Sequence, residues 1–194
     1  MDVAYLKSKL AHSFMRSETL LGMVKVLDRS SRETPAFNDP KYLPFYYHLG
    51  TQCTPKRVIQ VGSKLGLIGA CFLQGCKTVE NWLAVDEYSD NPPHNIIRSN
   101  LRMYSEAYIN YMMFDKELFE DNSTDLGLLT EKYGLAATER YMELLWKSLR
   151  SEGLLVVDYI HDEAMKKSFT EFCKVRNREP VLFDTRYGLG VVNK

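Results

Sequence analysis

The sequence lacks an excess of positive charge. Its 194 residues include 25 Lys and Arg against 25 Asp and Glu, so the formal net charge is zero. Proteins that bind nucleic acids or acidic membranes through phosphate groups usually carry a basic excess. We therefore expect neither a nucleic acid nor a membrane as a partner. The 45% of hydrophobic and 26% of charged residues are typical of a globular chain, and the length fits one domain.

Long hydrophobic runs are also absent. The longest apolar stretch, Leu65 to Leu73, is interrupted by Gly66 and Gly69, and it is much shorter than the roughly 20 residues that span a bilayer. The first residues, which include Asp2 and Lys7, do not follow the charged-then-apolar order of a signal peptide. We expect a soluble, cytoplasmic protein.

Paired cysteines are missing too. The four cysteines have neither the C-x-x-C spacing of a zinc site nor the density of a disulfide scaffold; they are Cys53, Cys71, Cys76 and Cys173. We expect free thiols in a reducing compartment, with Cys71 in the hydrophobic core.

The first 43 residues differ in pattern from the rest. Apolar residues recur at helical spacing up to about residue 30, whereas Ser30 to Pro44 is punctuated by Pro35 and Pro40 and predicts a loop or an extended strap. We expect residues 1–43 to form a helical N-terminal extension with this strap, and residues 44–194 to form the main domain. The aromatic run Phe45–His48 either lines a substrate pocket or packs in the core.

From Pro55 onward, short apolar segments alternate with helical ones, which indicates a doubly wound, mostly parallel sheet with helices on both faces. The predicted strands are Arg57–Val61, Trp82–Asp86, Tyr108–Phe114, Asp125–Thr130, Leu154–Tyr159, Pro180–Asp184 and Gly188–Asn193. The predicted helices are Leu67–Gly75, Asn95–Ser105, Ala136–Ser151 and Asp162–Arg176, the third of them stopped by Ser151-Glu152-Gly153. Because the last two strands are joined by a very short link, they must be antiparallel, with the other six parallel.

A glycine turn follows the first predicted strand. Gly62 and Gly66 lie between that strand and the next helix, and Asp86 comes 24 positions after Gly62, at the end of the second strand. Ligands of open α/β sheets bind outside the carboxyl ends of the strands, where an acid can accept hydrogen bonds from ribose hydroxyls. The pattern therefore favours a nucleoside site, although the glycines could merely permit a tight turn and Asp86 could cap a loop.

These residues resemble the class I S-adenosylmethionine-dependent methyltransferases. That family has acid-x-Gly-x-x-x-Gly after its first strand, and the matching positions are Gln60, Gly62 and Gly66; Asp86 and Asp115 match the acids near ribose and adenine. The closing hairpin resembles the family's reversed seventh strand, and the resemblance covers residues from about 44 to 194. It implies a Rossmann-like α/β fold with a seven-stranded, mostly parallel sheet.

The resemblance also implies a cofactor and a reaction. The cofactor would be S-adenosylmethionine, with S-adenosylhomocysteine as the product, and the methyl group would go to a small-molecule hydroxyl or similar nucleophile. The expected cofactor-binding residues are Gln60, Gly62, Ser63, Gly66, Asp86, Glu87, Asp115 and Thr130. A homo-oligomer is left open.

Three departures from the family pattern leave a second hypothesis open. Gln60 stands where the family usually has a carboxylate, Lys64 puts a cation near the expected sulfonium, and Thr130 replaces an aspartate that metal-dependent O-methyltransferases use as a ligand. The chain could therefore be a catalytically silent scaffold that works as a binding or structural subunit. A nucleotide-binding oxidoreductase is a weaker alternative, because the glycine spacing departs from G-x-G-x-x-G.

The remaining candidates for chemistry follow the fourth and fifth predicted strands. We expect the catalytic residues to be His161 as a base, with Lys132 and Asp158 nearby, although His161 could be a solvated loop residue. Asp158 and Glu131 could hold a divalent metal, but two carboxylates are too few to predict a metal site. Acidic residues gather near this predicted edge of the sheet and suit a cationic ligand.

Overall fold

The computed structural model describes residues 8, 42–63, 66–87 and 94–194. The predicted N-terminal helices, most of the strap and Lys64 lie outside these residues. Within the described part of the chain, no helix is both long and apolar enough to cross a membrane. All four cysteines are free, and Cys71 is fully buried, as expected.

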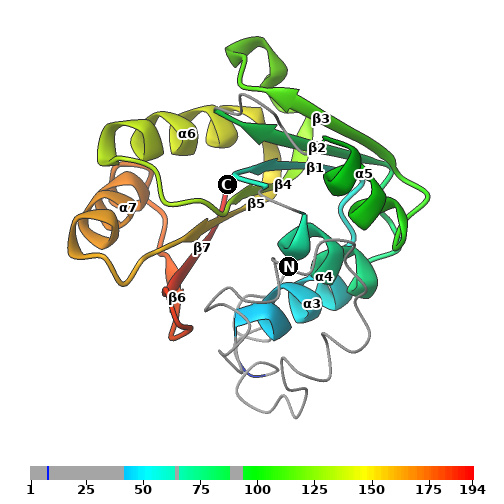
Figure 1. The fold of residues 1–194 in the computed structure, drawn as a ribbon. Coiled ribbons are helices and arrows are strands. Elements are labelled where there is room, and N and C mark those ends of the chain that lie inside the picture. Colours follow the sequence, from blue (N-terminus) through cyan, green and yellow to red (C-terminus); the bar gives the residue numbers. More distant parts are fainter. Residues whose placement is uncertain (1–7, 9–41, 64–65, 88–93) are drawn as a thin grey trace.

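A seven-stranded sheet runs through the molecule in the order β3-β2-β1-β4-β5-β7-β6 (Figure 1). The strands are β1 (Arg57–Val61), β2 (Asn81–Asp86), β3 (Tyr108–Met113), β4 (Thr124–Leu129), β5 (Leu149–Asp158), β6 (Val181–Phe183) and β7 (Leu189–Asn193). Neighbouring strands from β3 to β5 are parallel, and β7 is antiparallel to both β5 and β6. The predicted sheet with one reversed strand is confirmed.

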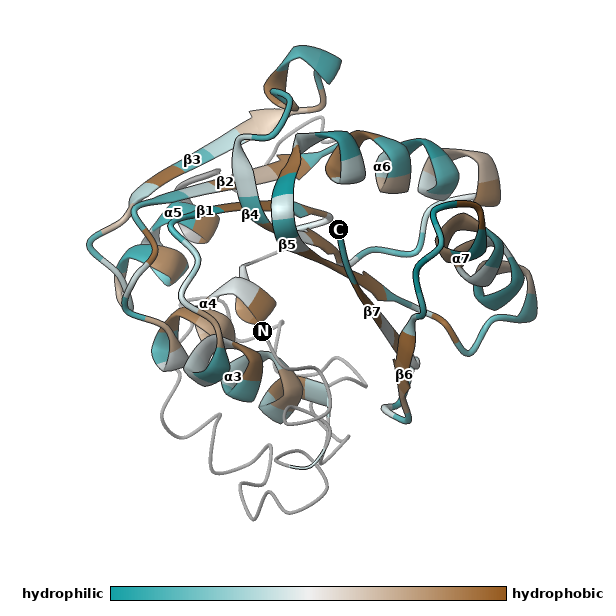
Figure 2. Cartoon of the chain, turned by 180° about the vertical axis from the view of Figure 1, so that it is seen from behind, coloured by the Kyte–Doolittle hydropathy of each residue, from teal (hydrophilic) through white to brown (hydrophobic). Residues whose placement is uncertain are grey.

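Helices cover both faces of this sheet. They are α3 (Tyr42–Gln52), α4 (Leu67–Gly75), α5 (His94–Arg102), α6 (Leu135–Ser148) and α7 (Glu163–Val175). Side chains of α3, α4 and α5 form one core with one face of the sheet, and α6 and α7 form a second core with the other face. Strand β1 contributes to both cores, because its residues Val58 to Val61 are all buried; Figure 2 shows the apolar character of the central strands.

Helix α3 corrects the predicted end of the strap. The strap was expected to reach Pro44, but α3 begins at Tyr42. Pro44 is tolerated there because it lies in the first turn of the helix, where a missing N–H breaks no intrahelical bond. Phe45 and Tyr46 are fully buried in the core, so core packing is the correct reading for these two members of the aromatic run.

The predicted stop of the α6 helix at Ser151-Glu152-Gly153 is wrong. Helix α6 ends at Ser148, and β5 already begins at Leu149. The reason is a long-range pairing: the Gly153 carbonyl accepts a hydrogen bond from the Lys194 N–H (2.8 Å), and the Glu152 N–H donates to the Lys194 carbonyl (3.2 Å). The end of the chain therefore holds this segment as a strand.

The connection from β3 to β4 contains no α-helix. Residues 114–123 form only the 3-10 turn η3 (Lys116–Leu118). Doubly wound folds usually place a helix in such a connection. Among the residues that the structure describes, no helix from this connection covers β3 on the face that α6 and α7 cover elsewhere.

Candidate functional site

The turn after β1 is built for glycine. Gly62 has a φ of 83°, a region that other residues rarely adopt, and a Cβ atom there would lie 2.2 Å from the Glu131 Cβ and 2.7 Å from the Glu131 nitrogen. The Gly62 N–H donates to the Val85 carbonyl (2.9 Å). The turn is thus pressed between the ends of β2 and β4. Gly66, with a φ of 80°, precedes the first residue of α4.

Asp86, at the end of β2, is bonded to this turn. Its Oδ1 accepts the Ser63 backbone N–H (2.8 Å) and its Oδ2 accepts the Ser63 hydroxyl (2.6 Å). The Tyr111 hydroxyl is a further donor to Asp86. Burial raises the pKa of the Asp86 carboxyl, while the Ser63 hydrogen bonds oppose this shift. The loop-cap alternative is therefore correct at least in part, because Asp86 fixes the glycine turn.

Gln60 and Thr130 form a second buried link beneath the turn. The Gln60 Nε2 donates to the Thr130 Oγ1 (2.9 Å), and the Thr130 hydroxyl donates to the Gly62 carbonyl (2.8 Å). Both side chains are almost fully buried. The Gln60 Oε1 has no hydrogen-bond partner among the residues the structure describes, and it lies 3.2 Å from the position of a Cβ on Gly69 in α4. A buried acceptor without a donor is costly.

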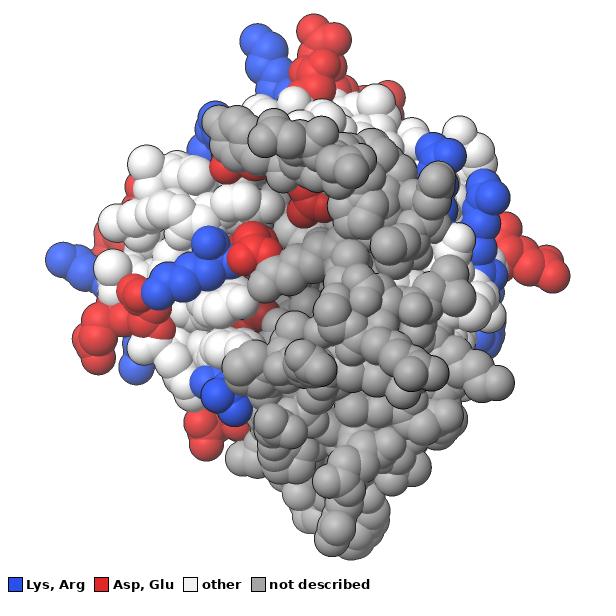
Figure 3. Space-filling model, in the orientation of Figure 1, with Lys and Arg blue, Asp and Glu red and all other residues white. Residues whose placement is uncertain are grey.

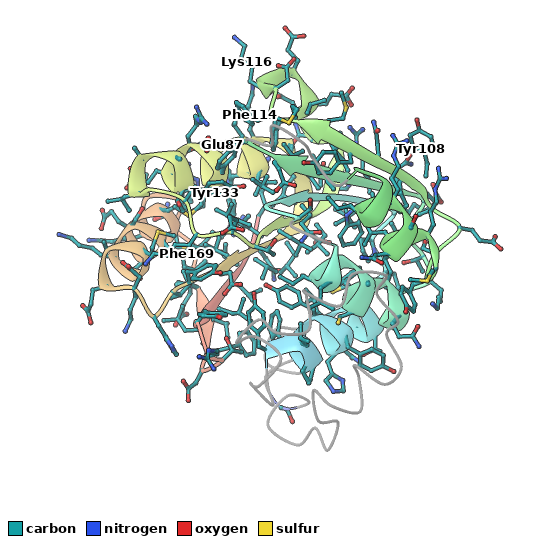
Figure 4. The ribbon with its side chains drawn as sticks, viewed as in Figure 1. Glu87, Tyr108, Phe114, Lys116, Tyr133 and Phe169 are labelled. Carbon is teal, nitrogen blue, oxygen red and sulfur yellow. The ribbon has the colours of Figure 1, made fainter. Side chains whose placement is uncertain are left out.

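Glu87 and a group of aromatic residues lie beside the acids. The Glu87 Oε1 pairs with the Arg140 Nη2 (2.5 Å), and Arg140 stacks on the Phe114 ring at 4.6 Å from its centroid. Burial, followed by the charges of Asp86 and other nearby groups, raises the pKa of Tyr133 well above its usual value. Figure 4 labels Glu87, Phe114 and Tyr133, which come from three different segments. Arg140, Phe114 and Tyr133 were not predicted from the sequence. Phe114 directly precedes Asp115 and Tyr133 follows Glu131 by two positions, so an aromatic residue beside a strand-end acid was the available signal for these two.

Asp115 and the three predicted catalytic residues have other contacts. Asp115 accepts the Glu117 N–H (3.0 Å) and caps η3. The Lys132 Nζ pairs with the Asp162 Oδ2 (3.1 Å), and Asp162 also caps α7. The hydrogen bond from Lys132 is the main cause that lowers the pKa of the Asp162 carboxyl, and the N–H groups at the start of α7 add to this effect.

Asp158 is buried at the end of β5. The Tyr42 hydroxyl donates to its Oδ2, and the Tyr159 N–H donates to its Oδ1 (2.8 Å). His161 is half-exposed; its Nδ1 lies 3.2 Å from the Arg186 carbonyl oxygen and its Nε2 lies 3.4 Å from the Asp184 Oδ1. Both ring nitrogens thus face oxygens of the β6–β7 connection.

The structure therefore brings five predicted cofactor residues into one bonded unit, which we call the turn cluster: Gln60, Gly62, Ser63, Asp86 and Thr130. Among the residues described, no three His, Cys, Asp or Glu side chains come together as metal ligands. On the described part of the face in Figure 3, Lys and Arg lie among Asp and Glu instead of forming a patch of one sign.

Several known structures with the same fold are methyltransferases. An S-adenosylhomocysteine-bound methyltransferase from Podospora anserina superposes with a TM-score of 0.68 at 14% identity, over 98% of this chain and 92% of that one. An O-methyltransferase from Bacillus cereus, in complex with S-adenosylhomocysteine, gives 0.62 at 12% identity over 98% and 96%. The O-methyltransferase TomG from Streptomyces achromogenes, in complex with S-adenosylmethionine, gives 0.62 at 11% identity over 79% of each chain.

Comparisons of the amino-acid sequence add no family to this likeness in fold. No protein-family model matches the chain, and no curated protein matches it. At identities of 11–14%, the likeness concerns the fold and not the site. The chain thus has the Rossmann-like fold of class I S-adenosylmethionine-dependent methyltransferases.

Proposed function

We propose that the protein binds S-adenosylmethionine at the turn cluster and transfers its methyl group to a small-molecule nucleophile, most simply a hydroxyl. The observation that carries the proposal is the buried Gln60 Oε1, an acceptor without a donor among the described residues, beside a glycine turn at the carboxyl edge of the sheet. Ligands of this type of sheet bind at that edge. The fold shared with the three methyltransferases supports the same site.

The residues present fit this cofactor. The Gln60 Oε1 could accept a hydrogen bond from an ammonium group, and the Asp86 carboxylate retains lone pairs for hydroxyl donors beyond those that Ser63 occupies. Asp86, Glu87 and Glu131 add negative charge around Tyr133, which favours a cationic ligand. When bound, S-adenosylmethionine supplies a methyl group on a positively charged sulfur. The Gly62 turn, held by Asp86, would keep the ligand's surroundings rigid.

We propose that His161 removes the proton from the methyl acceptor. Because both ring nitrogens face oxygens, His161 would have to release the Arg186 carbonyl or Asp184 before taking a proton. A positioned base typically contributes about 10²–10⁴-fold to the rate. If His161 has this role, the His161→Gln variant should lose that factor in kcat and also lose the histidine limb of the pH profile. A variant with an unchanged pH profile would assign His161 a structural role.

Calorimetric titration of the full chain with S-adenosylmethionine and S-adenosylhomocysteine tests the binding proposal. In Gln60→Met the acceptor is lost at similar side-chain volume. A hydrogen bond to a charged group contributes about 1.5–3 kcal/mol, so we expect affinity for either ligand to fall by roughly 10- to 100-fold. Gln52→Met, the same change at the half-buried C-terminal end of α3, is the matched control. Unfolding in urea shows whether each variant still folds.

The silent-scaffold hypothesis predicts that this titration shows uptake of neither ligand. The structural neighbours give it no support, because all three are named as methyltransferases. If the wild-type protein takes up neither ligand, or if Gln60→Met binds as tightly as wild type, the site proposed here is wrong.

A further inference from the structure

Exposed apolar side chains concentrate at one edge of the sheet. Among the described residues, seven large hydrophobic side chains are exposed, and four of them lie on β3 or shortly before it: Met103, Tyr108, Met112 and Met113. Tyr108 is the most exposed of these four, at 66%. Of these four, Tyr108 and Met112 point to the same face of β3, and exposed apolar side chains grouped in this way mark contact surfaces more often than scattered ones do.

Among the described residues, the face of β2 and β3 beside this edge is open. Because η3 replaces a helix, a hollow of about 350 Å³ remains there, with Leu83, Tyr108, Met112 and Leu118 among its lining residues. The side chains of Tyr108, Asn110 and Met112 point to this face, since Ile109 and Tyr111 belong to the core on the opposite side. The open face and the exposed edge are therefore continuous.

Strand β3 is an edge strand whose outer side can pair. Its one neighbour in the described sheet is β2. The Tyr108 N–H donates to the Glu80 carbonyl just before β2 (2.8 Å), and the Phe114 N–H donates to the Asp86 carbonyl at the end of β2 (2.9 Å). By alternation, the N–H and C=O groups of Ile109 and Met113 point outward. The strand sequence, Tyr-Ile-Asn-Tyr-Met-Met, contains neither the charges nor the proline that usually prevent edge pairing.

We propose that two copies of this chain pair through β3 as antiparallel strands, around a twofold axis that passes Tyr111. In this register Ile109 of each copy lies opposite Met113 of the other, and their outward backbone groups can exchange hydrogen bonds. The two sheets then continue into one, and closed twofold symmetry is the commonest form of self-association. The proposal is independent of the proposed methyl transfer.

Charge supports a second copy in this register. Glu106 and Lys116 are each five residues from Tyr111, with Glu106 in the loop before β3 and Lys116 at the start of η3, so each Glu106 comes near the Lys116 of the other copy, twice per dimer. Asp115 is in an extended conformation, which continues the strand direction toward Lys116. A shift by two residues would instead place Glu106 opposite Phe114, or Lys116 opposite Tyr108. Figure 4 shows Tyr108 at one end of β3 and Lys116 on η3, beyond the other end.

The open faces also join in this arrangement. With a twofold axis perpendicular to the sheet, the open faces of the two copies lie on the same side of the joined sheet. Tyr108 then lies opposite Phe114 of the other copy, and Asn110 lies opposite Met112. The exposed Tyr108 and Met112 side chains of both copies are then covered.

One contact must open for pairing to occur. Arg98, on α5, donates from Nη2 to the Asn110 Oδ1 at 3.3 Å. Since α5 packs on the opposite face from Asn110, the Arg98 side chain crosses the β3 edge. This hydrogen bond is long and exposed, so the side chain can swing away. Its removal should favour association.

Sedimentation equilibrium of the full chain tests the proposal. We expect a concentration-dependent dimer. Glu106→Lys and Lys116→Glu should each weaken the dimer by about tenfold or more, because each places like charges opposite one another twice, and the double variant should restore it. Tyr108→Lys should weaken association and Arg98→Ala should strengthen it. Val175→Lys, which changes an exposed side chain on α7, is the matched control and should have no effect.

Several results would overturn the proposal. A wild-type protein that is monomeric at the highest concentration reached, or that forms open-ended assemblies, excludes this closed dimer. A dimer insensitive to both single charge reversals uses another surface. If the single variants weaken the dimer and the double variant does not restore it, the register is wrong. Circular dichroism of each variant shows that its fold is intact; the charge reversals change exposed side chains.

Discussion

Replacing Gly62 with alanine tests the tight contact between the first and fourth strand ends. At a φ of 83°, a residue with a Cβ costs about 1–2 kcal/mol. The new Cβ would also overlap Glu131, at 2.2 Å from its Cβ and 2.7 Å from its backbone nitrogen, and overpacking typically costs about 1–3 kcal/mol. We therefore expect Gly62→Ala to lower the free energy of unfolding by about 2–5 kcal/mol.

Two other glycines separate these contributions. Gly66 has a similar φ of 80° but room for a Cβ, whose nearest neighbours lie at 3.5 Å, so Gly66→Ala should show the backbone strain alone, about 1–2 kcal/mol. Gly134 has a φ of −61° and no heavy atom within 4 Å of the added Cβ. Gly134→Ala should therefore change stability by only about 0.5 kcal/mol or less.

Urea unfolding of the three variants, followed by circular dichroism, provides the measurement. The predicted order of destabilisation is Gly62→Ala, then Gly66→Ala, then Gly134→Ala. Equal costs at Gly62 and Gly66 would mean that Glu131 does not press on the turn. A Gly62→Ala protein as stable as Gly134→Ala would refute the whole argument, including the rigidity attributed to the turn cluster.

Two further substitutions test contacts at the ends of β4 and β5. Tyr42→Phe removes the hydroxyl that donates to the buried Asp158. Because a buried acceptor then loses its donor, we expect the free energy of unfolding in urea to fall by about 1–3 kcal/mol. Tyr108→Phe, which changes an exposed ring, should leave stability unchanged, and equal effects of the two variants would contradict the prediction. Lys132→Met removes the main cause of the lowered pKa of Asp162, so carboxyl NMR titration should show that pKa rising toward its usual 3.8. A carboxyl group whose pKa is lower in the folded than in the unfolded state stabilises the fold at pH values above its unfolded-state pKa. This contribution disappears as the pH falls through the folded-state pKa. The wild-type protein should therefore lose stability relative to Lys132→Met as the pH falls below about 3.8. An unchanged Asp162 pKa in the variant would assign the shift to the helix cap alone.

Much of the sheet could be predicted because its signals are local. Helix α4 has its predicted bounds, Leu67–Gly75, and β1 has its predicted bounds, Arg57–Val61. A buried parallel strand requires a continuous apolar run, and the short link between the last two strands permits only an antiparallel pair. These constraints act over a few residues and are visible in the sequence itself.

The misplaced boundaries depend on distant partners. Residues 151–153 resemble a helix stop, but the chain terminus pairs with them and extends β5. In the same way, the start of α3 at Tyr42 depends on the core that Tyr42 enters and on its hydrogen bond to Asp158. Neither partner lies within reach of a local pattern.

The sequence by itself determined which residues stand at the carboxyl edge, because strand-end acids and glycines are placed there by the order of strands and helices. Only the tertiary structure decided what those residues do with their polar atoms. Asp86 holds Ser63, Asp158 is buried under Tyr42, and the Gln60 Oε1 has no donor in the described part of the chain. The physical reason is that a side chain's hydrogen bonds depend on which segments the topology brings within about 3 Å.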